Sequence, residues 1–167
     1  MSNLFSKSSA ILSECRKYRY FLSRIWGDGG KYLGWVMLNP STADSDIDDP
    51  TIRRCIRFSR RWGYDGLIVL NLFAFRTPLP DNLRKTPCPV SEPNDFGRNN
   101  RFIQWFSNKC VLMVAAWGRR GKLMNRDKIF VDEVLSGIQL YCLGRNSDGT
   151  PKHPLYCRGD LGLVEYP

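Results

Sequence analysis

Two apolar, aromatic-rich runs dominate the beginning of the chain. Residues 18–26 (YRYFLSRIW) and residues 32–38 (YLGWVML) have the composition of β-strands, and the glycine-rich segment 27–30 between them has that of a turn. The pattern predicts an N-terminal β-hairpin. Its second strand should end at Asn39-Pro40, because proline cannot donate a further ladder hydrogen bond.

A helix is predicted shortly after this hairpin. Asp49-Pro50 combines a favoured N-cap residue with proline at the first helical position. Residues 51–62 then repeat candidate core positions at helical spacing, and Gly63 ends the segment. The arginines of the segment should face solvent, because the positions expected to face the core are Ile52, Cys55, Ile56 and Ser59.

Apolar runs and helix-like segments alternate through the rest of the chain. Residues 67–72 (LIVLNL) and 110–116 (CVLMVAA) are nearly continuous apolar runs, which is typical of buried parallel strands. We expect one helix from the Asn94-Asp95 cap to about residue 107 and another over residues 126–135. A further strand is expected over residues 138–143.

This alternation predicts the fold class and the place of the site. One domain over residues 1–167 should form a three-layer α/β/α sandwich around a mostly parallel sheet of about four or five strands. The proline-containing loop 73–93 should have a functional role, because loops that only connect two elements are usually shorter. In such sheets ligands bind beyond the carboxyl ends of the strands. That rule brings Asn39, Asn71 and His153 to one cleft.

The charge of the chain suggests a polyanionic partner. The net charge is +9, from 25 Lys+Arg against 16 Asp+Glu, and lysine or arginine that neutralises phosphate releases counterions. A basic but solvated surface is the alternative. The basic residues gather in two groups: Arg53, Arg54, Arg57, Arg60 and Arg61, and further along Arg119, Arg120, Lys122, Arg126 and Lys128.

The composition argues against a metal, a cofactor and a membrane. Six cysteines occur without a CxxC pair, and His153 is the only histidine, so we expect neither zinc nor an iron–sulfur cluster. No apolar run approaches the length of a membrane span, and no secretory signal is evident. We therefore expect a cytoplasmic monomer with free thiols and no cofactor.

Four segments, in chain order, are similar to motifs of the uracil-DNA glycosylase superfamily. Residues 36–41 (VMLNPS) resemble its first motif, a strand ending in Gly-x-Asn-Pro-Gly or Gly-Gln-Asp-Pro. Residues 67–72 (LIVLNL) resemble its second strand, whose terminal asparagine reads the pyrimidine edge. Residues 114–118 (VAAWG) resemble the third strand with its Leu-Gly or Trp-Gly ending, and residues 152–155 (KHPL) resemble the final His-Pro-Ser-Pro.

The resemblance runs from about residue 32 to residue 156, within a divergent, short bacterial and phage branch that is filed as a domain of unknown function. Ser41 stands where many members have glycine or tyrosine, and the last motif lacks its Ser-Pro continuation. These departures from the motifs affect which base the enzyme would excise. Uracil is the default of the superfamily, and a modified pyrimidine of the kind that masks phage DNA is the alternative, which would suit anti-phage defence.

The resemblance implies a DNA glycosylase that holds a flipped base and cuts its bond to the sugar. His153 would donate to the departing base, and Asn39 would orient the attacking water. Asn71 would pair with the base edge, and Phe73 or Phe75 would stack on the base. Asp44 is the candidate general base, because Asp49 is assigned to the helix cap. The only lysine in the four segments is Lys152, and the resemblance assigns it no Schiff-base role, so the enzyme should be monofunctional and use water.

Contacts to DNA should come from the end of the last motif and from residues outside the motifs. Leu155 and Tyr156 could wedge into the gap left by the base, and Arg76 could clamp a phosphate. Arg57 and Arg61 are candidate DNA contacts on a face that is otherwise solvated. Structural roles compete with each assignment: core packing for the two phenylalanines, a strand-end cap for Asn71 and a surface loop for His153.

The sequence is also compatible with other functions. An N-glycosidase or hydrolase of free nucleosides or nucleotides would use the same cleft without a continuous basic surface. A non-catalytic nucleic-acid-binding module would keep the pocket but not the reaction. A regulatory DNA-binding protein is disfavoured, because no helix-turn-helix or zinc motif occurs, and neither a P-loop nor a dinucleotide fingerprint is present.

Overall fold

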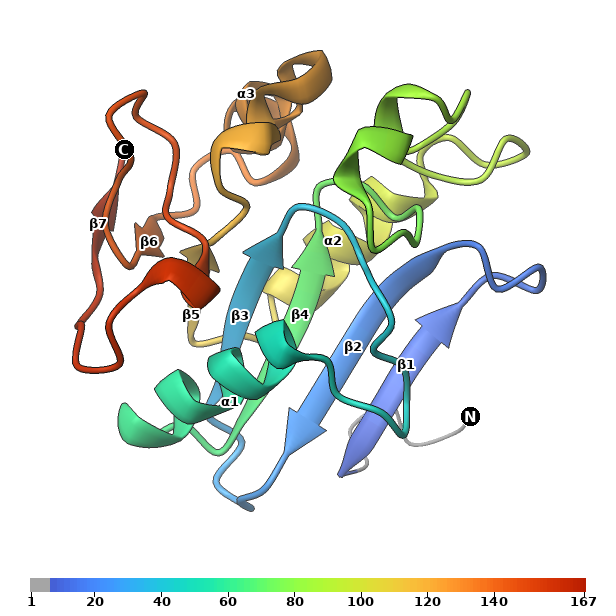
Figure 1. The fold of residues 1–167 in the computed structure, drawn as a ribbon. Helices are drawn as coiled ribbons and strands as arrows, with labels where there is room; N and C mark the ends of the chain where they lie inside the picture. Colours follow the sequence, from blue (N-terminus) through green and yellow to red (C-terminus); the bar gives the residue numbers. More distant parts are fainter. Residues whose placement is uncertain (1–6) are drawn as a thin grey trace.

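A single mixed sheet organises the protein. The computed structural model describes residues 7–167, and within them seven strands follow the order β1-β2-β4-β3-β5-β6-β7 (Figure 1). The strands are β1 (Ser8–Leu12), β2 (Arg19–Ile25), β3 (Tyr32–Met37), β4 (Gly66–Asn71), β5 (Leu112–Ala115), β6 (Leu140–Cys142) and β7 (Val164–Tyr166). The α/β class predicted from the alternation is therefore confirmed.

The centre of the sheet is parallel and its edges are antiparallel. Strands β4, β3, β5 and β6 run parallel, whereas the pairs β1–β2, β2–β4 and β6–β7 are antiparallel. The prediction of a mostly parallel sheet of four or five strands thus holds only for its centre. The edge strands escaped prediction because β1 begins with two serines and β7 has only three residues.

The predicted hairpin between β2 and β3 is wrong. These strands are not neighbours, because β4 lies between them and pairs with both. All six residues of β4 are buried, and a strand that is apolar on both faces is best protected inside a sheet. The hairpin forms instead between β1 and β2, while the turn after β2 is tied to the segment before β4 through the Trp26 and Gly27 amides, both 2.9 Å from the Asp65 carbonyl oxygen.

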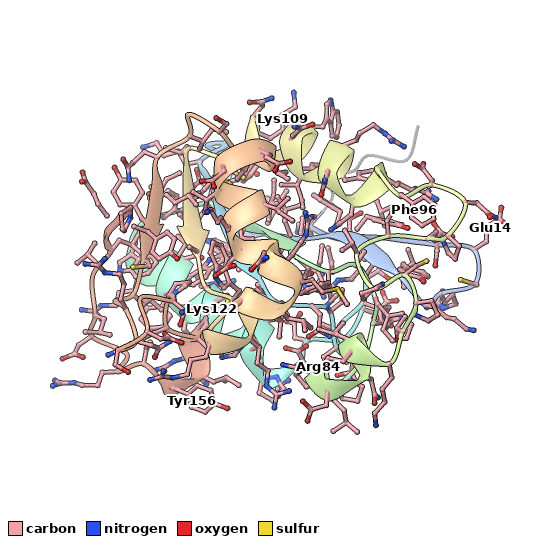
Figure 2. All side chains as sticks on the ribbon, turned by 90° about the horizontal axis from the view of Figure 1, so that it is seen from above. Glu14, Arg84, Phe96, Lys109, Lys122 and Tyr156 are labelled. Atoms are coloured by element: carbon pink, nitrogen blue, oxygen red, sulfur yellow. The ribbon has the colours of Figure 1, made fainter. Side chains whose placement is uncertain are left out.

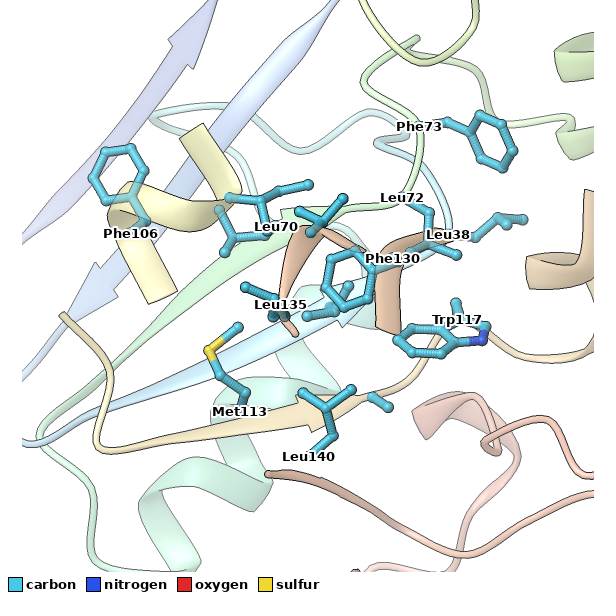
Figure 3. Packing of buried hydrophobic residues seen from close by; sticks show 14 of the residues in the cluster. Leu38, Leu70, Leu72, Phe73, Phe106, Met113, Trp117, Phe130, Leu135 and Leu140 are labelled. Carbon is cyan, nitrogen blue, oxygen red and sulfur yellow. The ribbon is translucent and has the colours of Figure 1, made fainter. Parts of the chain in front are cut away.

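Helices cover both faces of the sheet. Helix α1 (Pro50–Arg61) packs on the face that presents Leu33, Trp35 and Met37, and it lies in front of the sheet in Figure 1, with α2 behind. Helix α2 (Arg98–Ser107) covers the opposite face together with α3 (Arg126–Ile129), which continues into a wider π-helical turn, Phe130–Val134. Figure 3 shows the core of that face, a cluster that includes Phe106, Phe130, Leu70 and Leu140.

The sequence signals at the start of α1 are confirmed. The Asp49 carboxylate accepts a hydrogen bond from the Ile52 amide at 2.9 Å, and Pro50 is the first helical residue. Phe58 is buried on the inner face where Ile56, which is only half-buried, was expected. The indole nitrogen of Trp35 donates to the Ser59 hydroxyl at 3.0 Å, which fastens the helix to β3.

The predicted start of α2 is wrong. The helix begins at Arg98, with Gly97 as its N-cap residue, rather than at Asn94-Asp95. Asp95 instead forms an ion pair with Arg101. The preceding loop is anchored on the end of β4, because the Ala74 and Phe75 amides donate to the Val90 and Pro89 carbonyls at 3.2 and 3.0 Å.

Short 3-10 turns complete the carboxyl edge of the sheet: η1 (Pro80–Arg84), η2 (Arg119–Asn125) and η4 (Pro154–Tyr156). Across residues 7–167, none of the helices has the length and apolarity needed to span a bilayer.

Trp117 is tightly packed, so added volume beside it should destabilise the protein. It contacts the rings of Phe130 and Tyr166 edge-on, and a Cβ added at Gly121 would lie 2.0 Å from its Cδ1 atom. Gly121→Ala should therefore lower the free energy of unfolding by about 1–3 kcal/mol through overpacking. Gly162→Ala, where an added Cβ meets no atom within 4 Å, is the control, and equal unfolding midpoints in urea would contradict the prediction.

Candidate functional site at the carboxyl edge of the sheet

A cavity of about 630 Å³ opens where β3, β4 and β5 end. This volume lies within the usual range of small-molecule sites. Asn39 follows β3, Asn71 ends β4, and His153 precedes η4, yet all three line the cavity. The structure thus brings together the three residues that the strand-end rule selects.

Asn39 is anchored through its amide nitrogen. Nδ2 donates to the carbonyl oxygens of Pro40 and Thr77, both at 2.9 Å, and the Thr77 amide returns a bond to the Pro40 carbonyl oxygen at 2.9 Å. These bonds join the loop after β3 to the loop after β4. Because both amide hydrogens are used, only Oδ1 is left to face a ligand, and it can accept a hydrogen bond from water.

Asn71 lies deeper, with 2% of its surface exposed. Its Oδ1 atom accepts a hydrogen bond from Nη2 of Arg19 at 3.3 Å. Its backbone oxygen accepts a bond from the Asn99 amide group at 3.0 Å, which fixes the end of the strand. Its Nδ2 atom is buried and has no hydrogen-bond partner among the described residues. Asn71 therefore offers two unused N–H donors at the cavity.

His153 has a defined tautomer. Its Nδ1 atom accepts a hydrogen bond from the Leu155 amide at 3.3 Å, so the proton of the neutral ring sits on Nε2 and is available to a ligand. Burial lowers the pKa of His153, and the negative charge of Asp49 partly opposes this shift. Gly118 packs beside the histidine with φ +71°, a conformation in which other residues are strained.

Two cavity residues escape sequence reasoning. Asp49 lines the cavity as well as capping α1, and the sequence pattern explained it fully as a cap. Arg19 lines the cavity from the first position of β2, where it is 2% exposed. No strand-end rule could find it, because β2 runs antiparallel and Arg19 lies at its amino end.

The rim of the cavity is basic. Arg119 and Arg120 of η2 line it, and Lys152 lies beside His153. Arg119 pairs with Asp148 at 3.4 Å, and Arg120 pairs with Asp81 of η1. The Arg120–Asp81 pair joins two turns that both border the cavity. The rim thus combines partly neutralised arginines with the charge of Lys152.

Asp44 does not line the cavity. Its carboxylate accepts hydrogen bonds from the Asp46 and Ile47 amides at 2.9 and 3.0 Å, which lower its pKa. This arrangement closes a local turn, as aspartate side chains commonly do. The assignment of Asp44 as the general base is therefore corrected, and Asp49 is the carboxylate that the structure places at the cavity.

Neither phenylalanine lines the cavity, so neither offers a stacking surface there. Phe73 is fully buried in the core, at the edge of the cluster in Figure 3, and Phe75 packs edge-on against Tyr18 at 5.6 Å. Arg76 also lies outside the cavity lining, and its Nη1 atom donates to the Arg16 carbonyl oxygen at 3.1 Å. The long loop therefore packs its aromatic residues inward.

Leu155 and Tyr156 stand at the mouth of the cavity. Both line it, and Tyr156 is 85% exposed and points away from the body of the protein in Figure 2. Arg57 faces solvent, and its side chain forms no hydrogen bond or ion pair with another described residue. Arg61 donates to the Gly159 carbonyl oxygen, so it holds the C-terminal loop against α1.

No cluster of three His, Cys, Asp or Glu side chains occurs in residues 7–167 that could hold a metal ion. The six cysteines are free. The polar side chains that line the cavity are amides, hydroxyls, an indole, one imidazole, one carboxylate and several cations.

The chain matches, over residues 19–155, the family described as "Protein of unknown function (DUF1643)". The match covers most of the chain, so the chain belongs to this family. No curated protein and no solved structure matches it. The matched range includes Arg19, Asn39, Asp49, Asn71 and His153, and Tyr156 lies just beyond it.

The electrostatics of the site can be tested directly, because His153 is the only histidine. Its imidazole should titrate below the ordinary value of about 6.5, since burial disfavours the charged ring. Asp49→Asn should lower the pKa of His153 further, because it removes a negative charge that favours the imidazolium. Asp160→Asn, outside the cavity, is the control. Carbon-detected titration by NMR measures the midpoint, and an unchanged value in Asp49→Asn would contradict this electrostatic picture.

Proposed function

We propose that the protein is a DNA glycosylase that hydrolyses the N-glycosidic bond of a uracil-like or modified pyrimidine flipped into the cavity. The observation that supports this most is the meeting of Asn39, Asn71 and His153 in one cavity, with the imidazole Nε2–H free to donate. A base cannot be reached inside a duplex, so such an enzyme needs a pocket of this size beside a surface for the strand.

Different cavity residues act on the base and on the sugar. His153 donates from Nε2 to an oxygen of the base as negative charge develops there, and it does so as a neutral donor because burial lowers its pKa. Asn71 donates from Nδ2 to an acceptor on the base edge. Water attacks the sugar carbon, the bond to the base breaks, and the base leaves with the bonding electron pair.

Asp49 serves the sugar side of the reaction. It lines the cavity, and its charge acts on both Arg19 and His153: burial lowers the pKa of each, and the charge of Asp49 partly opposes that shift. A carboxylate there can take the proton of the attacking water and stabilise the cation-like sugar, which the amide of Asn39 cannot do. Asn39 holds the water through Oδ1, because its Nδ2 hydrogens are bound to the loops.

A path for the DNA strand adjoins the cavity. Arg53, Arg54, Arg57 and Pro50 line a shallow depression on α1, and Leu155 borders both this depression and the cavity. A phosphate backbone that crosses the arginines therefore reaches the cavity at Leu155 and Tyr156. Contacts of this kind position a strand without reading its sequence.

A hydrolase of free nucleotides is the second candidate, because the cavity contains a buried arginine, Arg19. A phosphate would satisfy that charge without any need for the arginines of α1. The two candidates differ in what they cleave: only the glycosylase acts on a base within a duplex.

The activity is tested on duplex oligonucleotides that carry uracil or a phage-type modified pyrimidine. We expect release of the free base and an intact strand that breaks only after alkali, with no effect of a chelator and no adduct trapped by borohydride. His153→Ala should lower kcat by about 100-fold or more while DNA binding persists, because the lost bond acts in the transition state. Strand breakage without alkali that a chelator abolishes would identify a nuclease, and cleavage confined to free nucleotides would favour the second candidate.

The role of Asp49 can be separated from its role as a helix cap. Asparagine and serine are N-caps as good as aspartate, so Asp49→Asn and Asp49→Ser should retain the melting temperature and lower kcat by about 100-fold. Asp49→Ala should lose about 1 kcal/mol of stability as well.

Asp44→Asn is the matched control for these variants. Its side chain also closes a turn, but it lies outside the cavity lining, so kcat should stay near that of the unmodified protein. Full activity in Asp49→Asn would show that Asp49 only caps the helix.

A further inference from the structure

The floor of the cavity holds a buried cation. Arg19 begins β2 with 2% of its surface exposed, and it lines the cavity. Its Nη1 atom donates to the Ala43 carbonyl oxygen at 2.7 Å, and its Nη2 atom donates to Oδ1 of Asn71 at 3.3 Å. A guanidinium group carries five N–H donors, so these two bonds leave most of its donors unused.

No carboxylate of the described residues contacts this guanidinium directly, although the charges of Asp49 and Asp44 act on it from further away. None of the ion pairs among residues 7–167 includes Arg19, and its Nε atom is buried without a hydrogen-bond partner. Burial lowers the pKa of Arg19 to about 10, so the group stays charged at neutral pH. A buried charge without a partner is costly, which calls for a ligand that supplies the missing charge.

Arg19 also fixes the orientation of the Asn71 amide. Arginine can only donate, so it holds Oδ1 of Asn71 toward itself and leaves Nδ2 without a partner. The carboxylate of Asp49 does not fill the gap, because it binds the Ile52 amide and forms no ion pair with Arg19. The Nε atom of Arg19 and the Nδ2 atom of Asn71 are therefore buried donors without acceptors among the described residues.

We propose that Arg19 and Asn71 form a donor-only subsite that binds a negatively charged, oxygen-bearing group of the ligand. Under the proposed function, on which this assignment of the ligand rests, that group is an anionic substituent on the flipped pyrimidine. The same chemistry would arise from the phosphate of a free nucleotide. Arg19 thus determines specificity, since it favours an anionic ligand over a neutral one of the same size.

Binding of free bases tests the subsite without any need for catalysis. The probes are 5-carboxyuracil and 5-methyluracil, which are similar in size but differ in charge, and calorimetry measures their affinities. The unmodified protein should bind the carboxylated base at least about tenfold more tightly, as expected for a hydrogen bond to a charged group. Arg19→Met should abolish that preference. Arg158→Met, which removes an exposed arginine outside both the cavity and the arginine-lined depression, should retain it.

Uridine monophosphate and uridine separate the two sources of the anionic group. If the Arg19-dependent preference appears for uridine monophosphate over uridine but not for 5-carboxyuracil over 5-methyluracil, the subsite exists but serves a nucleotide phosphate, and it is the DNA glycosylase proposal that fails. Equal affinities within both pairs in the unmodified protein, or preferences that survive in Arg19→Met, would overturn the subsite itself.

A second measurement covers the case in which Arg19→Met does not fold. In the unmodified protein, the side-chain NH₂ resonances of Asn71 should shift further with 5-carboxyuracil than with 5-methyluracil, because only the first adds a charged acceptor beside the base edge. Resonances that respond equally to both probes, or to neither, would also overturn the subsite.

Discussion

The insertion of β4 between β2 and β3 is the constraint on which the site depends. Pairing with β3 is parallel and pairing with β2 is antiparallel, so the carboxyl end of β4 meets the carboxyl end of β3 and the amino end of β2. Asn71 thereby lies between the loop that carries Asn39 and the first residue of β2, Arg19. A hairpin of β2 with β3 would have separated Arg19 from Asn71. The apolar content of β4, buried along its whole length, is what favours the central position.

The sequence predicts local features well and strand partners poorly. The cap and proline at Asp49-Pro50 act within one turn of helix, and the structure has them as the pattern indicates. The pairing of β2 depends on which strand buries more apolar surface, and that competition among distant segments leaves no local signature. The same limit hid β1 and β7, whose short and partly polar sequences become strands only beside a neighbour that supplies hydrogen bonds.

The site residues also differ in whether the sequence could predict them. Asn39, Asn71 and His153 could be predicted because the strand-end rule for parallel sheets applies to them, with η4 bringing the histidine to the same edge. Arg19 could not, because it stands at the start of an antiparallel strand. Asp49 could not be assigned to the site for another reason: the helix-cap pattern accounts for an aspartate at this position without any role in binding. Phe73 shows the opposite error, since its place after a strand end suggested a ligand contact although its side chain turns into the core.

The contacts around the cavity differ in strength from floor to rim. The floor belongs to the sheet, where Arg19 and Asn71 are fixed by buried hydrogen bonds and packing. The rim is closed across η1 and η2 by the pair Arg120–Asp81, in which both side chains are more than half exposed. Exposed pairs contribute little and weaken in salt. A polyanion that arrives at the rim competes with Asp81 for Arg120, so its approach can loosen the entrance while the floor keeps its shape.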